Sequence, residues 1–468
     1  MIWTGVMMDH KFKAILIEGP IGRALYQMAV PMVWGMLAMM AFNLVDTYFV
    51  AKLGSIPLAA MGFTFPVVFT VGHLSLGIGI GASSVIARGI GEGDSNKVRR
   101  IATDSILLSL LVVCITAVLG FLTIEPLFRV MGASEETIGY IAAYMRVWYV
   151  GVIFVVLPMI GNHVIRASGD TFLPGVIMIS GALLNIILDP ILIFGYGGCP
   201  AMGIRGAALA TVIARAGTFV LALWVLYFRK KMITFKPVAF SRIVRSWMEI
   251  LHIAIPSAFS MVLPMVCLGV LTWMVSGFGQ KAVAGFGVAG RVEGMSQVIF
   301  MALFTVFGPF VGQNYGAMKI NRIRKGFTKV VNFSCLWGVV QAVILFLLAA
   351  PIAALFDKDP EVMRVAVLYL RIIPLSYVGV SIIFLTASAF NALGKPRPAI
   401  LLMLIRLVVL HLPLAFLAKK FFGLEGFFSV SYVASIVTAA IAIRWLSRTL
   451  KGIENREGGQ GHSAAPSS

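Results

Sequence analysis

The sequence predicts an all-α integral membrane protein, with twelve transmembrane helices in two six-helix lobes that are related by a parallel internal repeat. The first reason is composition: of 468 residues, 59% are hydrophobic and only 12% are charged, and the mean hydropathy is +0.95. The second is that apolar runs of about 20 residues or more, enough to cross a bilayer, recur along the whole chain. The third is that the second half repeats the first. These features exclude a water-soluble domain and a disordered chain.

The predicted helices follow the apolar runs in chain order, and the short loops between them leave no room for a soluble catalytic domain. The runs are 24–50, 57–87, 101–124, 137–165, 172–196, 204–228, 248–276, 281–312, 327–355, 361–391, 398–418 and 424–447. The longest basic stretch separates the sixth run from the seventh. The predicted organisation is a leader (1–23), an N-lobe (24–228), an inter-lobe linker (229–247), a C-lobe (248–448) and a tail (449–468).

Basic residues are divided unevenly between the two ends of the helices. Of 38 Lys and Arg residues, 25 lie on the side of the two termini, 8 lie on the other side, and the rest lie within helices. Because basic loops stay in the cytoplasm, both termini are expected there, in a multi-pass protein of the cell (inner) membrane. The same rule accounts for the net charge of +19 without a nucleic-acid partner. Residues 1–23 lack a cleavable signal, so they predict a cytoplasmic leader.

Distinctive residues of the two halves superpose when the chain is shifted along itself without a gap, so that Pro31 meets Pro256. Each half has an even number of helices, so both halves enter the membrane in the same sense. The two halves are then related by an axis along the membrane normal. The same shift also pairs Gly62 with Gly287, Gly91 with Gly316, Tyr144 with Tyr369 and Arg146 with Arg371.

Motifs of soluble chemistry are absent from the sequence. There is no phosphate-binding GxxxxGK[ST] loop, no HExxH and no Cys or His cluster, so we expect no cofactor and no enzyme. A membrane-embedded enzyme, the alternative from another class, would need a nucleophile or a metal cluster. The Gly77-x-Gly79-x-Gly81 run lies inside an apolar helix, where it predicts close helix packing. Energy is therefore expected from an ion gradient or a partner chain.

Three carboxylates lie well inside apolar runs, at Asp46, Asp189 and Glu293. A charge at mid-membrane costs roughly 2.5 kcal/mol or more, so such residues indicate a functional site by default, with a structural ion pair as the alternative. Asn43 lies three residues before Asp46, on the same helical face, so the two side chains are expected to converge.

Asp189 repeats this arrangement, with Asn185 one turn earlier. Pro190 has no amide hydrogen, so it also frees the carbonyl group of Ile186. Each residue of a helix rises by about 1.5 Å, and counting from the helix ends places Tyr144 and Thr211 at the same depth as the two aspartates. Oxygen ligands of this kind suit sodium, and a buried carboxylate suits a proton.

Glu293 is the corresponding candidate of the second half. Arg291, two residues earlier, points in another direction on a helix, so the two are not expected to pair. Glu293 is equally consistent with a structural pair and with a role in transport. Arg406 is a weaker candidate for a C-lobe role, because packing or interhelical hydrogen bonding explains it better. The repeat places Leu271 and Leu414 opposite the N-lobe aspartates, so the predicted coupling site belongs to one lobe.

Three sequence features are specific in combination. They are Pro31 followed by N-L-V-D-T-Y-F-V, the segment L-N-I-I-L-D-P-I with the later G-I-R-G-A-A-L-A-T, and G-Q-N-Y-G-A at 312–317. On these residues the chain resembles the multidrug and toxic compound extrusion (MATE) family, in its DinF-like branch, from about residue 23 to 448. The resemblance implies antiport of cationic or amphipathic organic compounds against sodium or protons by alternating access.

The resemblance also implies roles for particular residues. The residues that match the family's cation or proton coupling site are Asp46, Asn185, Asp189 and Thr211, which would be the metal ligands if the ion is sodium, and Tyr144 matches the associated tyrosine. Pro31 would bend the first helix. One departure is a longer loop at 197–200, between Asp189 and Thr211.

The predicted function is secondary active multidrug efflux, exchanging small organic cations or amphipathic drugs for Na⁺ or H⁺ across the lipid bilayer. The two lobes of one chain suffice for this, so a monomer is expected. The alternative within the same fold is a flippase of a lipid-linked sugar or another lipid, which would need a more basic cavity. Arg291, Arg371 and Arg406 keep that alternative open.

Overall fold

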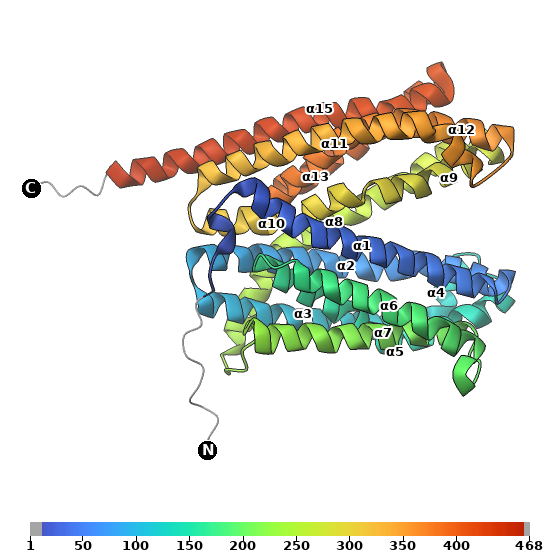
Figure 1. The fold of residues 1–468 in the computed structure, drawn as a ribbon, viewed down its shortest axis with the longest axis horizontal. Helices are drawn as coiled ribbons and strands as arrows, with labels where there is room; N and C mark the ends of the chain where they lie inside the picture. The colour runs from blue at the N-terminus through green and yellow to red at the C-terminus, as the bar shows by residue number, and fades with distance from the viewer. Residues whose placement is uncertain (1–11, 463–468) are drawn as a thin grey trace, which may run out of the picture. The chain divides into compact units, whose positions relative to one another are not determined.

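The computed structural model describes residues 12–462, whose backbone is helical throughout apart from short connections and contains no β-strand (Figure 1). Contacts between helices divide the described chain into two compact units. Unit 1 comprises Gln27–Ala258 and the described residues up to Ile15, and unit 2 comprises Leu16–Tyr26 and the residues from Phe259 onward. Two helices, the first and the eighth, therefore contribute residues to both units.

The helices of the first half begin with the 3₁₀ turn η1 and end with the π-helical turn η3. Their bounds are η1 (Ile15–Ile17), α1 (Ile21–Ala51), α2 (Ser55–Glu92), α3 (Ser95–Leu122), α4 (Ile124–Val130), α5 (Glu135–Ala167), α6 (Phe172–Phe194), η2 (Tyr196–Gly198), α7 (Ile204–Trp224) and η3 (Val225–Arg229).

The helices of the second half include a 3₁₀ turn, η4, and a π-helical segment, η5. Their bounds are α8 (Phe240–Ser276), α9 (Gln280–Ser296), α10 (Val298–Gly316), α11 (Ile320–Ala354), α12 (Pro360–Ile372), η4 (Ile373–Ser376), α13 (Tyr377–Ala392), α14 (Pro396–Leu404), η5 (Ile405–His411) and α15 (Leu412–His462).

Among the described residues, eleven helical segments are long and apolar enough to cross a membrane. The last of them, Pro396–Asn455, has 60 residues and would be about 90 Å long if straight, three times the hydrocarbon thickness. Gly423 interrupts it with a non-helical backbone (φ 61°, ψ −147°). Arg406 Nε donates to Ser435 Oγ at 3.3 Å, so the chain turns back between these residues. This segment makes two crossings, which gives the predicted twelve.

Several helices begin before the predicted apolar runs. α3 begins at Ser95 instead of 101, α8 at Phe240 instead of 248, and α11 at Ile320 instead of 327. The added turns carry basic residues such as Lys97, which the apolar criterion excludes although helices continue into the aqueous layer. The predicted leader at 1–23 lies partly outside the described residues, and the predicted tail at 449–468 begins as a continuation of α15.

The described part of the leader is anchored to unit 2. The backbone of Leu16 donates to Gln313 Oε1 at 3.1 Å and accepts from Asn314 Nδ2 at 3.1 Å. Arg322 adds bonds to the carbonyl groups of Glu18 and Gly19, at 2.7 and 2.8 Å. The segment before α1 therefore has a fixed place on α10 and α11.

The stretch predicted as an inter-lobe linker, 229–247, packs onto unit 1. Lys230 forms an ion pair with Asp170 at 2.7 Å, and Met232 is fully buried. The backbone N–H of Thr234 donates to Thr103 Oγ1 at 3.0 Å. The boundary between the compact units lies further along, inside α8 after Ala258, because these contacts hold the stretch and the start of α8 against α3.

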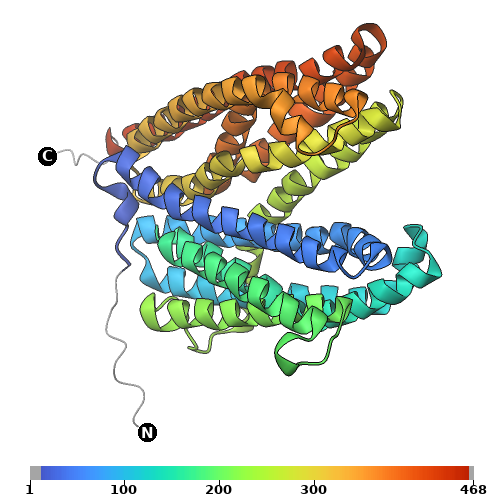
Figure 2. The same cartoon turned by 45° about the vertical axis from the view of Figure 1, so that its right-hand side comes forward.

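Helix α5 is the centre of unit 1, where it packs against α2, α3 and α7, while α7 also packs against α6 (Figure 2). The approach of α5 to α7 is close: a Cβ added at Gly151 would lie 2.3 Å from Val212 Cγ2. Trp148 is 2% exposed and anchors the same helix in the core. This packing fixes the register of the helices that carry the candidate site.

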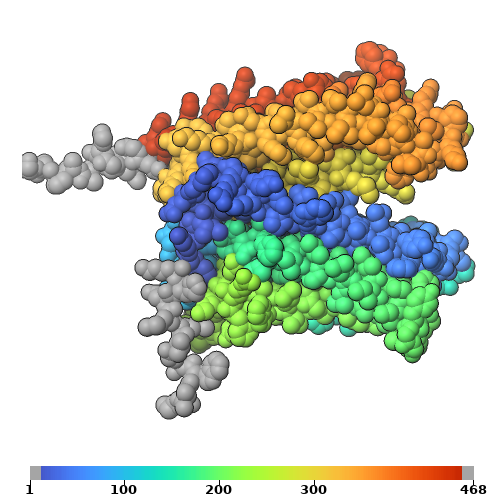
Figure 3. Space-filling view, in the orientation of Figure 1, coloured from blue at the N-terminus to red at the C-terminus, as the bar shows by residue number. Residues whose placement is uncertain are grey.

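In unit 2, α11 and α15 form a large part of the surface in Figure 3 (orange and red). Leu336, Val339, Val343 and Leu347 are exposed at helical spacing along α11, while Gln341 and Leu345 on its other side are buried. An exposed apolar stripe on a helix of this length is the surface expected to face lipid.

The predicted close packing at the glycine run of α2 is confirmed. A Cβ at Gly77 would lie 2.7 Å from the carbonyl oxygen of Ala254, and one at Gly81 would lie 2.6 Å from that of Ile250, both on the first half of α8. A Cβ at Gly79 would meet the ring of His163 at 2.5 Å. Backbone atoms cannot yield as flexible side chains do, so these sites need glycine.

We therefore expect Gly77→Ala to destabilise the protein by about 1–3 kcal/mol, the usual cost of overpacking. Gly72 on the same helix is the matched control, because nothing lies within 4 Å of its added Cβ. Gly72→Ala should be neutral or stabilising by up to about 1 kcal/mol, since alanine favours helix. Thermal unfolding of the purified protein in detergent measures both; equal melting temperatures for the two variants would contradict the packing.

Candidate ion-coupling site

Asp46 lies on the buried stripe of α1. Phe42, Asp46 and Val50 follow one another at four-residue spacing, and all three are less than 9% exposed. The apolar residues of this stripe pack inside unit 1, so the carboxylate of Asp46 is buried with them. Asp46 is therefore turned into the protein and away from the surface, as expected of a charged residue in a membrane helix.

Asn185 and Asp189 occupy the buried face of α6, one turn apart, with exposures of 1% and 0%. In the amide orientation that satisfies both neighbours, Asn185 donates to Asp189 Oδ2 at 2.9 Å. Its oxygen accepts from the backbone N–H of Thr211 on α7 at 3.2 Å. Asn185 thus joins the two helices. Pro190 lies inside α6, where its missing N–H leaves the Ile186 carbonyl group without its helical donor.

Tyr144 and Thr211 complete the cluster from α5 and α7, and both side chains are less than 9% exposed. Tyr144 lies within electrostatic reach of both Asp46 and Asp189, and the two carboxylates repel each other when both are ionised. Four helices therefore bring Asp46, Tyr144, Asn185, Asp189 and Thr211 together, although these residues are widely separated in the sequence.

Each carboxylate has one oxygen with unused bonding capacity. Oδ1 of Asp46 and Oδ1 of Asp189 are buried and have no hydrogen-bond partner among the described residues. A buried carboxylate oxygen without a donor is costly. A proton on the oxygen, or a hard cation such as sodium shared by the oxygens, removes that cost. The residues present therefore fit either ion.

The structure does not bring Asn43 into this cluster. Asn43 is exposed, because it lies about 60° around α1 from Asp46, off the stripe that runs through Phe42 and Val50. Pro31 lies within α1, which continues as a helix from Ile21 to Ala51. Gly175 of α6 packs on it, so that an added Cβ would lie 2.8 Å from the Pro31 carbonyl oxygen.

A second polar cluster surrounds Glu293 in unit 2. Tyr369 donates a short hydrogen bond to Glu293 Oε2, and Tyr377 lies within electrostatic reach of the same carboxylate. Tyr369 is the residue that the internal repeat pairs with Tyr144. Both halves therefore have a tyrosine beside a carboxylate at the position that the repeat superposes. In unit 1 the carboxylates come from α1 and α6, and in unit 2 the carboxylate comes from α9. Sequence reasoning missed this partner, although the repeat contained the signal.

Arg291 and Arg406 have different surroundings. Arg291 is exposed and forms no ion pair with Glu293, as its spacing predicts. Arg406 lies in the π-helical segment η5, bonds Ser435, and lies within electrostatic reach of Glu293. Irregular helical turns of this kind are frequent at functional sites. The role of Glu293 in transport stays a prediction.

Arg215 is a further arginine within a membrane helix, α7. It lies one turn after Thr211 on the same face of α7, and its guanidinium lies 5.5 Å from the centroid of the Phe42 ring. Its Nη2 donates to Met39 Sδ at 3.6 Å. The four-residue spacing from Thr211 was the signal that would have placed it beside the site.

The chain as a whole is similar to known proteins. The family model described as MatE matches residues 31–191 and 256–417. The chain belongs to the MATE family. The two matches begin at Pro31 and Pro256, which are the residues that the predicted internal repeat superposes. Members of this family are transporters, so the chain is a multi-pass membrane transporter and not an enzyme.

Individual MATE proteins align over nearly the whole chain. This chain is 34% identical to the FAD transporter of Shewanella oneidensis over 411 residues, and the alignment covers 88% of this chain and 91% of that protein. It is 27% identical to the multidrug export protein MepA of Staphylococcus saprophyticus, covering 91% of this chain and 93% of that protein. The structure of this chain is similar to that of the Vibrio cholerae MATE transporter VcmN in the bent form, with a TM-score of 0.88 and 30% sequence identity. The superposition covers 92% of this chain and 98% of the VcmN chain.

These similarities confirm the predicted fold class, since MATE structures have twelve transmembrane helices in two lobes. They also confirm the predicted class of membrane transport protein. The narrower assignment to the DinF-like branch stays a prediction, because the relatives do not distinguish that branch.

Proposed function

We propose that this MATE protein is a secondary antiporter, which exports amphipathic organic compounds, organic cations among them, in exchange for Na⁺ or H⁺. The observation that carries the proposal is the pair of buried Asp46 and Asp189 oxygens without a hydrogen-bond donor. An ion that binds there stabilises one conformation of the transporter, and a cargo that favours the other conformation reverses the shift.

The ion and the cargo need not touch for this exchange. A ligand shifts a conformational equilibrium by the difference between its affinities for the two states, and coupling is reciprocal. Loading the carboxylates removes the repulsion between Asp46 and Asp189, which makes close approach of α1 and α6 more favourable. Coupling is thus a property of unit 1, with Asn185 and Thr211 as neutral ligands.

Two cargo classes are consistent with the relatives. MepA is a multidrug export protein, which favours varied amphipathic compounds for the present chain. The Shewanella oneidensis relative is named as an FAD transporter, and its 34% identity favours a flavin dinucleotide as a second candidate cargo. We further propose that the protein works as a monomer in the inner membrane, with both termini in the cytoplasm, as the distribution of basic residues indicates.

The proposal is tested by efflux of ethidium from proteoliposomes that contain the full-length protein. The membrane potential is clamped with potassium and valinomycin, so that only the imposed sodium or proton gradient differs between samples. We expect one of the two gradients to raise the efflux rate at least about tenfold, equivalent to a gradient contribution of about 1.4 kcal/mol. The gradient that does so identifies the coupling ion.

Liposomes without protein and samples whose gradient is collapsed by monensin or by a protonophore serve as controls. The same measurement with FAD in place of ethidium distinguishes the two cargo classes. Protein-dependent efflux of either compound at a rate that neither gradient changes would contradict antiport.

A further inference from the structure

A groove of about 730 Å³ lies on the surface of unit 1, between α5 and α7. This volume is within the range of about 300–1,000 Å³ that small organic ligands occupy. The first turns of α5 form one wall. The start of α7 and residues 201–203, which follow the longer loop at 197–200, form the other. The groove therefore lies at the end of the membrane region where both helices begin.

The groove has a charged end and an apolar end. Glu136 and Arg205, the second residues of α5 and α7, line the charged end with exposed side chains. Among the described residues the ion pairs join other side chains, so both charges are available to a ligand. Ala143, Val147 and Leu209 are half-buried apolar residues that line the other end. The lining thus offers one anion, one cation and an apolar surface to the same ligand.

The register of α5 against α7 sets the order of these groups. Because both helices begin at the groove, they run in the same sense, and their close approach places Gly151 opposite Val212. Seven residues earlier on each helix lie Tyr144 and Arg205, so Arg205 enters the groove deeper than Glu136. Its long side chain points back toward the start of α7, as helical side chains do, and so toward the level of Glu136. From water inward the groove therefore presents a negative charge, a positive charge and an apolar surface.

We propose that this groove binds phosphatidylethanolamine, with the ammonium group at Glu136, the phosphate group at Arg205 and an acyl chain on the apolar surface. In this lipid the ammonium lies beyond the phosphate, farthest from the acyl chains, which is the order of the lining charges. A carboxylate accepts N–H bonds from a primary ammonium, and a guanidinium donates two to a phosphate. The choline headgroup of phosphatidylcholine has no N–H to donate, so the groove distinguishes two lipids of the same net charge.

The depth of the apolar surface favours a lipid over a soluble zwitterion. Val147 comes eleven residues after Glu136, about 16 Å along the helix and therefore inside the hydrocarbon layer. Tyr140 is exposed between these two levels, where a ring with a polar hydroxyl suits the membrane interface. A lipid in the groove contacts both helices that carry Tyr144 and Thr211, so its binding is expected to stabilise unit 1. The lipid is not cargo, so the inference goes beyond the proposed function.

The test titrates the full-length protein in detergent with phosphatidylethanolamine, phosphatidylcholine or phosphatidylglycerol of identical acyl chains, and native mass spectrometry gives the dissociation constant of each. We expect the wild type to bind phosphatidylethanolamine about fivefold more tightly than the other two, which is what an ion contact partly open to water contributes. Glu136→Gln should abolish the preference over phosphatidylcholine. Arg205→Gln should weaken the binding of all three lipids, since each carries a phosphate. Comparison with the wild type subtracts lipid that is bound elsewhere.

Glu135→Gln is the matched control for charge. Glu135 lies in the same helical turn, but it forms an ion pair with Arg129 at 2.9 Å and does not line the groove, so the variant should keep the preference. Gly139→Phe places a ring in the groove, because nothing lies within 4 Å of an added Cβ there. It should abolish the preference and keep the melting temperature measured without added lipid. Gly62→Phe, at an equally open glycine of α2, should leave both unchanged.

Equal wild-type affinities for phosphatidylethanolamine and phosphatidylcholine would overturn the inference. So would tighter binding of phosphatidylglycerol, which would assign the groove to an anionic lipid held by Arg205 alone, or a lipid preference that survives in Gly139→Phe. The titration uses neither cargo nor an ion gradient, so its failure leaves the antiport proposal intact. Efflux that no gradient changes, with the lipid preference retained, removes only the antiport proposal.

Discussion

Asp46→Asn and Asp189→Asn are each expected to lower gradient-driven efflux roughly ten- to hundredfold, because an interaction with a charged group is worth about 1.5–3 kcal/mol. An amide has nearly the shape of the carboxylate but neither releases a proton at physiological pH nor offers sodium a negative oxygen. Initial efflux rates in proteoliposomes under the effective gradient measure the loss.

The stability of the same variants separates coupling from structure. Both carboxylates have a buried oxygen without a partner, so neutralising either one should leave the melting temperature unchanged or raise it. Asp94→Asn is the matched control for the change of chemistry. Asp94 caps α3 by accepting from the N–H of Lys97, and asparagine caps equally well, so export should persist. Undiminished export in both site variants, or a large fall in their melting temperatures, would make the two aspartates structural.

Asp104→Ala is expected to destabilise unit 1 by about 3–5 kcal/mol, the cost of removing one partner of a buried ion pair. Asp104 is fully buried on α3, and its Oδ2 accepts from Arg100 Nε at 2.8 Å. The Arg100 side chain is only 19% exposed, so the variant would leave a positive charge that water reaches poorly. Thermal unfolding in detergent and the yield of folded protein both report this effect.

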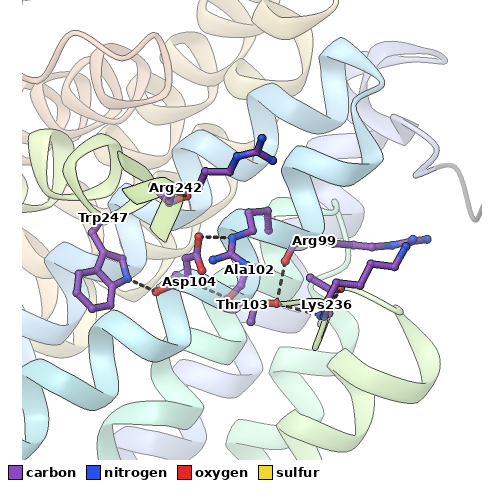
Figure 4. Close-up of polar contacts among 11 residues, drawn as sticks. Arg99, Ala102, Thr103, Asp104, Lys236, Arg242 and Trp247 are labelled. Carbon is purple, nitrogen blue, oxygen red and sulfur yellow. Dashed lines mark hydrogen bonds and ion pairs between the residues drawn. The ribbon is translucent and has the colours of Figure 1, made fainter. Parts of the chain in front are cut away.

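The same residue also holds the start of α8. The backbone carbonyl of Asp104 accepts from Trp247 Nε1 at 3.0 Å, as Figure 4 shows. Replacing both members of the pair, as in Arg100→Leu with Asp104→Leu, should recover much of the lost stability, because no unpaired charge remains. Arg129→Ala, which breaks a solvent-exposed pair with Glu135, should have no measurable effect. A single Asp104→Ala variant as stable as Arg129→Ala would contradict the buried-pair account.

Most of the candidate site could be predicted from the sequence because charges in apolar helices are rare. Asp46, Asp189 and Glu293 are conspicuous against 59% hydrophobic residues, and counting along the helices places Tyr144 and Thr211 at their level. The structure agrees with this depth for Asp189 and Thr211, because Asn185 donates to Asp189 and accepts a hydrogen bond from the backbone N–H of Thr211. Asn43 shows the limit of such counting, since three-residue spacing places a side chain near a face without fixing which face is buried.

The number of crossings, the internal repeat and the position of each carboxylate along its helix can be read from the residues, because the bilayer dictates helix length and penalises charge. Which helix faces meet is visible only in the folded chain. The tertiary structure joined the stretch at 229–247 to unit 1 and divided α8 at Ala258. It also paired Tyr369 with Glu293 and set Arg215 against the Phe42 ring of α1. In a membrane, the helix face toward lipid is as apolar as the face toward the protein interior, so hydrophobicity alone does not show which face packs against another helix. Small residues such as Gly77 and Gly151 do show it, because neighbouring helices approach closely at each of them.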